Sequence, residues 1–110
     1  MKGLLIEYQY CDGCHSCEMA CKAEHGWDPD KWGIMLAQIG PFQIGEGKWN
    51  YDYVPVPTDM CDLCADRLEL GKLPTCVHHC QSQVMHYGDV EELAKRAAAT
   101  DKTVLFSLDR

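Results

Sequence analysis

The pattern of apolar and polar positions predicts short strands near both ends of the chain and a helix before the second of them. Residues 4–8 (Leu-Leu-Ile-Glu-Tyr) and residues 104–106 (Val-Leu-Phe) have the apolar content of strands, and we expect both to lie in one sheet. Asp89, followed three residues later by Glu92, is typical of a capping box at the start of a helix. That helix would end near Thr100 and pack on the sheet through Val90, Leu93, Ala94 and Ala97.

Residues 34–57 predict a β-hairpin. Aliphatic residues precede Gly45-Glu46-Gly47 and aromatic residues follow it, which favours two strands joined by a glycine-rich turn. No linker rich in proline or serine divides the chain, so its 110 residues are expected to form a single α+β domain.

Composition and charge exclude several classes of function. The formal net charge of −7 has the wrong sign for binding nucleic acid phosphates. No apolar run approaches the roughly 18 residues of a membrane span, and the first residues do not resemble a secretory signal. We therefore expect a cytoplasmic location, with export alongside a signal-bearing partner left open. No Walker motif, complete dinucleotide fingerprint or serine-protease order of residues is present, so we expect no catalytic residues and no enzyme activity of the chain alone.

The eight cysteines fall into two groups with informative spacing. The first group occupies residues 11–21 and has the pattern C-x2-C-x2-C-x3-C, which matches the [4Fe-4S] motif of bacterial ferredoxins. Gly13 eases the turn between the first two thiols. Ser16 is expected to cap a helix that carries Cys17 and Cys21 on one face, about 6 Å apart along the axis.

The second group occupies residues 61–80, has the pattern C-x2-C-x11-C-x3-C, and ends with the same three-residue gap. In two-cluster ferredoxins the last cysteine of each group ligates the cluster of the other group. Applied here, this rule predicts two [4Fe-4S] clusters. Their metal and cofactor ligands would be Cys11, Cys14, Cys17 and Cys80 for one cluster, and Cys61, Cys64, Cys76 and Cys21 for the other.

Zinc and disulfides are the alternatives for these thiols. Structural zinc sites use two separated C-x2-C pairs, and three successive cysteines at this spacing would crowd a single ion. A disulfide scaffold requires an oxidising compartment. A Rieske centre needs two histidine ligands, whereas the cysteines already form two complete sets.

Three stretches resemble the electron-transfer iron-sulfur subunits of the dimethyl sulfoxide reductase (molybdopterin oxidoreductase) family. They are CDGCHSCEMACKAEHG (residues 11–26), CDLCADRLELGKLPTCVHHC (61–80) and VMHYGDVEEL (84–93). The resemblance implies a bacterial two-[4Fe-4S] ferredoxin-like fold with an inserted hairpin at about 34–57 and a strand, helix and strand at about 83–107. Larger members hold four cysteine groups and up to four clusters, whereas this sequence has two groups.

The function implied by this resemblance is electron transfer beside a large catalytic subunit that carries a molybdopterin with molybdenum or tungsten. An external electron carrier is a possible second partner, and a freestanding two-cluster ferredoxin is the alternative. The aromatic residues Trp27, Trp32, Trp49, Tyr51 and Tyr53 would either dock this subunit or shield the clusters. We expect Tyr10 to cover the first cluster, and His78 and His79 to adjust the cluster potentials. His25 and His86 lie outside any ligand spacing.

Overall fold

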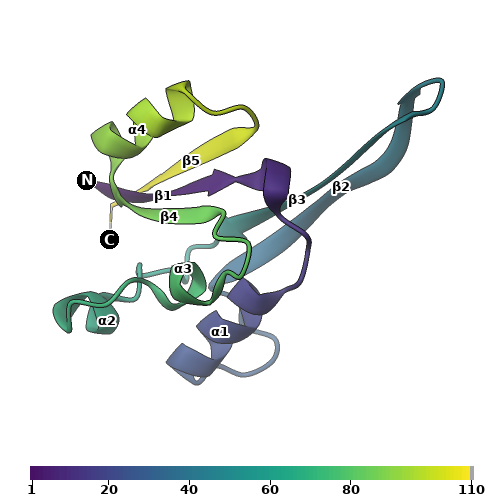
Figure 1. The fold of residues 1–110 in the computed structure, drawn as a ribbon. Helices are drawn as coiled ribbons and strands as arrows, with labels where there is room; N and C mark the ends of the chain where they lie inside the picture. Colours follow the sequence, from purple (N-terminus) through teal and green to yellow (C-terminus); the bar gives the residue numbers. More distant parts are fainter. Residues whose placement is uncertain (110) are drawn as a thin grey trace.

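The chain folds into a three-stranded sheet, a separate two-stranded hairpin and four α-helices, an α+β arrangement seen in a computed structural model that describes residues 1–109 (Figure 1). In chain order the elements are β1 (Lys2–Glu7), the 3₁₀ turn η1 (Tyr8–Tyr10), α1 (Ser16–His25), β2 (Ile34–Gly45), β3 (Lys48–Pro57), α2 (Ala65–Glu69), α3 (Thr75–His79), β4 (Met85–Asp89), α4 (Val90–Ala98) and β5 (Thr103–Leu108). Within residues 1–109, no helix is long and apolar enough to cross a membrane.

The three-stranded sheet has the order β4-β1-β5, with both pairs antiparallel. Strand β1 lies in the centre, and Leu4, Leu5 and Ile6 are at most 1% exposed. A strand covered on both faces needs apolar residues at consecutive positions, which explains its unbroken apolar run. The N-terminal and C-terminal strands lie in one sheet, as expected, and pair directly with each other; the packing of α4 on this sheet, through the buried Leu93, is also confirmed.

Strands β2 and β3 form an antiparallel hairpin whose base belongs to the core and whose far end extends away from it (Figure 1). Ile34 and Pro55, at the base, are buried. Towards the turn, Phe42, Ile44 and Trp49 are 50%, 61% and 62% exposed. The base of the hairpin therefore shapes the cysteine sites, while its outer half presents apolar side chains to solvent.

The two predicted helix caps do not form. Helix α1 begins at Ser16 itself, with His15 in the N-cap position, and the Ser16 hydroxyl lies 3.2 Å from the Cys14 thiol. Asp89 occupies the N-cap position of α4, but its carboxylate binds the Lys2 ammonium at 2.8 Å and makes no capping bond. In both places the side chain contacts a residue outside the helix instead.

Candidate metal centre

Both cysteine groups begin with the same turn, Cys-Asp-x-Cys. In the first group the Cys14 amide donates to the Asp12 carboxylate at 3.1 Å, and in the second the Cys64 amide donates to Asp62 at 2.8 Å. The residue between Asp and the second Cys has a positive φ in each case, which suits the glycine at position 13 and is also adopted by Leu63. The two cysteines of each turn line the same cavity.

Four thiols line a first small cavity, of about 20 Å³. They belong to Cys11, Cys14, Cys17 and Cys80, so three come from the first group and one from the end of the second. Leu36 and Pro55, from the base of the hairpin, and Val84 and Met85, near β4, supply apolar parts of the wall. The hairpin is therefore part of the first site.

The other four thiols line a second small cavity, of about 10 Å³. They belong to Cys61, Cys64, Cys76 and Cys21, so here the thiol that crosses over comes from the first group. The Thr75 amide donates to the Cys64 sulfur at 3.5 Å, and the Gly33 amide donates to the Cys21 sulfur. Amide donors directed at sulfur are suited to thiolates that carry negative charge.

Helices α1 and α3 connect the two cavities. Cys17 and Cys21 lie on α1, one at each cavity, and Cys76 on α3 and Cys80 at its C-terminal cap do the same. The two helices pack against each other. Since four residues of helix advance about 6 Å, the cavities are close neighbours.

Burial raises the pKa of the thiols that line the inner walls of both cavities. It is the main cause for Cys17 and Cys21, whose pKa rises to about 12, and for Cys76, whose pKa rises well above its ordinary value. Negative neighbours raise these values further: Glu18 and Cys11 act on Cys17, whereas Cys64 and Cys61 act on Cys21. A cation in each cavity would reverse this preference, because metal-bound thiols are deprotonated. The donor sets therefore fit iron-sulfur clusters.

Comparison with known proteins identifies the family. The profile of the 4Fe-4S dicluster domain matches residues 30–90, more than half of the chain. The chain belongs to the 4Fe-4S dicluster domain family. Membership of this family, together with eight free cysteines, gives the chain two [4Fe-4S] clusters.

The dicluster domain is also similar to subunits of several oxidoreductases, one of which is named as an iron-sulfur subunit. It is 28% identical over 93 residues to a subunit of the anaerobic dimethyl sulfoxide reductase of Escherichia coli (strain K12), covering 84% of this chain and 34% of the relative. It is 31% identical over 88 residues to the arsenate respiratory reductase iron-sulfur subunit ArrB of Shewanella sp. (strain ANA-3), covering 76% and 31%. A shorter match, 41% over 39 residues, links it to formate dehydrogenase subunit beta of Megalodesulfovibrio gigas, covering 36% and 18%. The chain spans about a third of the length of the first of these relatives.

The structure places the aromatic and histidine side chains that were expected near the clusters. Tyr10 is 62% exposed, and the ring of Tyr53 instead lies against Gly13 in the first cysteine loop. His78 and His79 are exposed. The residue that sequence reasoning passed over is His25, which lines the second cavity. The sequence did contain an indication of this: His25 lies four residues after Cys21, and residues at that spacing share one face of a helix.

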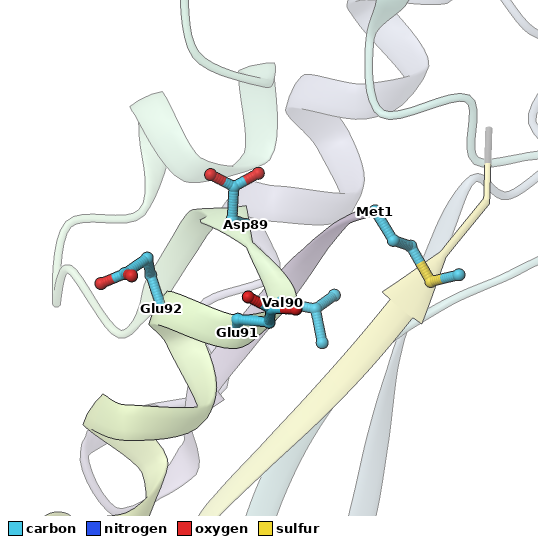
Figure 2. A pocket seen from close by; sticks show the side chains of 5 residues that line it. All are labelled: Met1, Asp89, Val90, Glu91 and Glu92. Carbon is cyan, nitrogen blue, oxygen red and sulfur yellow. The ribbon is translucent and has the colours of Figure 1, made fainter.

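A further hollow at the start of α4 is separate from the cysteines (Figure 2). It is lined by Met1, Asp89, Val90, Glu91 and Glu92. The acidic residues there follow the preference of helix N-termini for negative charge.

Proposed function

We propose that the dicluster domain transfers electrons through two [4Fe-4S] clusters whose ligands are exchanged between the cysteine groups. One cluster would be held by Cys11, Cys14, Cys17 and Cys80, and the other by Cys61, Cys64, Cys76 and Cys21. The observation that carries this proposal is that each set of four lines its own cavity. In the proposal residues 1–110 act as one domain, because removing either cysteine group would leave both sites incomplete.

When bound, a [4Fe-4S] cluster takes up and releases single electrons. The residues of the chain provide the environment around each cluster. Cys17, Cys21 and Cys76 are buried together with Leu4 and Ile6 in one apolar cluster, which keeps water away from the region between the two cavities. At the first cavity, Cys14 is exposed and Cys11 partly exposed, so this site is the more accessible to an external redox partner.

The proposed partner is a large molybdopterin-bearing subunit, and the dicluster domain is the non-catalytic subunit beside it. The names of the relatives support this, since they are subunits of a dimethyl sulfoxide reductase, a formate dehydrogenase and an arsenate respiratory reductase. The β2-β3 hairpin, which a minimal ferredoxin lacks, also supports the hypothesis of a large partner subunit. Its exposed Phe42, Ile44 and Trp49 suit a permanent protein contact better than free diffusion. Because clusters on free thiols are best assembled under reducing conditions, we place this assembly in the cytoplasm.

Anaerobic purification from the native source tests the cluster content and the partner separately. The proposal predicts about eight iron atoms and eight acid-labile sulfides per chain. Zinc at one or two ions per chain, with a colourless protein, would contradict it. Size-exclusion chromatography then distinguishes the partner hypotheses: elution with a much larger molybdenum- or tungsten-containing chain supports the subunit role, whereas elution as a single small chain with a full set of clusters indicates a freestanding ferredoxin.

A further inference from the structure

His25 occupies a special place beside the second cavity. Its Nδ1 lies 2.9 Å from the carbonyl oxygen of Cys21 and 3.8 Å from the Cys21 sulfur. Its Nε2 lies 3.2 Å from the carboxylate of Asp62. Both oxygen neighbours are acceptors, so a proton on either ring nitrogen finds a partner.

The contacts of His25 join the two cysteine groups. Cys21 is the thiol of the second cavity that comes from the first group, and Asp62 belongs to the turn that carries Cys61 and Cys64. The Asp62 carboxylate oxygen that faces His25 also accepts the Cys64 amide at 2.8 Å. One side chain therefore links α1 to the loop that presents two other thiols of the same cavity.

The ring of His25 is itself held in place. It stacks on Trp27 with ring centroids 4.4 Å apart and planes inclined by 17°, and its side chain is 18% exposed. A ring held by stacking, with an oxygen acceptor beside each nitrogen, has little freedom to turn away from the sulfur. Metal-binding side chains are commonly oriented by such neighbours, and their loss costs about 10- to 100-fold in affinity.

We propose that His25 is a positioning residue for the cluster of the second cavity: it directs an N–H from Nδ1 towards the Cys21 sulfur, while Asp62 and Trp27 keep its ring in this orientation. This inference rests on the ligand sets proposed above. His25 would then adjust the reduction potential of the second cluster, a role that the sequence suggested for His78 and His79. The bonds of His79 are to Thr75, whose carbonyl oxygen lies 2.9 Å from Nδ1.

The test compares three variants of the full chain, purified anaerobically with clusters. His25→Leu removes the polar contacts of both ring nitrogens, while His25→Asn keeps a side-chain N–H near the position of Nδ1 but is too short to reach Asp62. His79→Leu is the matched control, because it makes the same substitution in a helix that also carries cluster ligands. Reduction potentials are measured by redox titration followed by electron paramagnetic resonance. The Cys61→Ser variant identifies the signal that belongs to the second cavity.

We expect His25→Leu to lower the equilibrium constant for one-electron reduction of the second cluster about tenfold, which corresponds to about 59 mV. A donor near a thiolate favours the reduced, more negative cluster, so its loss disfavours reduction. The first cluster should keep its potential in every variant. His25→Asn should restore most of the change, and His79→Leu should have no effect.

Three results would overturn the inference. These are unchanged potentials in His25→Leu, a shift confined to the cluster that Cys61→Ser leaves intact, and a His25→Asn variant as strongly affected as His25→Leu. If His25→Leu loses the second cluster altogether, His25→Asn decides: a retained cluster near the wild-type potential supports the role, and a lost cluster refutes it. A wild-type chain without about eight iron atoms would refute the proposed function instead, before any variant is compared.

Discussion

Replacing Gly33 by alanine is expected to weaken the second cluster selectively. A Cβ at this position would lie 2.5 Å from the Cys21 sulfur and 2.6 Å from a ring carbon of Trp27. Ordinary contacts begin near 3.4 Å, so the sulfur or the backbone of residue 33 would have to move by about 0.9 Å. The close approach explains why a glycine suits this position, which is buried at the entry to β2.

Neither Cys21 nor Trp27 can move away from a new Cβ without disturbing a contact that it already makes. Cys21 accepts the Gly33 amide and lines the second cavity with three other thiols, so moving its sulfur pulls it out of that set. Trp27 is stacked on His25. Overpacking of this kind costs about 1–3 kcal/mol, which corresponds to roughly 5- to 150-fold weaker retention of the cluster.

The assay is anaerobic release of iron to a chelator in excess, followed by absorbance. Gly33→Ala should release about half of its iron faster than the wild type, while the other half should leave at the wild-type rate. Gly45→Ala is the matched control, because a Cβ there would meet nothing closer than 3.9 Å. If Gly33→Ala releases all its iron at the wild-type rate, or loses both clusters equally, the reasoning about this contact is wrong.

Three further predictions follow from buried polar groups and from the clusters. Glu18→Ala should destabilise the protein by about 1–3 kcal/mol in anaerobic urea unfolding, because the Leu36 amide, now donating to Glu18 at 2.9 Å, would lose its acceptor. Glu18→Gln keeps an acceptor oxygen and should lose less; equal losses would contradict this explanation. Burial, and to a lesser degree Arg96, lowers the pKa of His86 below its ordinary 6.5, so the unfolded chain binds a proton more readily and stability should fall as the pH drops below that value. His86→Gln should flatten this part of the pH profile, and an unchanged slope would exclude His86 as its cause. Removing the iron with a chelator should loosen the core around the cysteines, seen as faster amide hydrogen exchange in α1 and α3; native-like protection would show that the clusters add little stability.

Much of the fold could be predicted because its signals are local or repeat along the chain. The apolar runs at 4–8 and 104–106 and the apolar face of α4 depend on short-range periodicity, and the structure confirms their arrangement. The grouping of the thiols followed from their spacing, and the two cavities are lined by the same two sets. Whether these sets bind the clusters as proposed remains a prediction for mutagenesis.

What the sequence did not predict depends on contacts between distant segments. Tyr53, not Tyr10, lies against the first cysteine loop because of the path taken by the hairpin. The helix cap expected from Asp89 is replaced by its ion pair with Lys2, a residue on another strand. The proximity of His25 to Asp62 spans 37 positions of sequence, which no local pattern indicates.

The exchange of one cysteine between the two groups is tested most directly by comparing single cysteine variants. Cys80→Ser should alter the electron paramagnetic resonance signal and potential of the cluster that Cys14→Ser also alters, although residue 80 lies at the end of the second group. If Cys80→Ser instead alters the cluster that Cys61→Ser affects, each cysteine group binds its own cluster and the exchange does not occur.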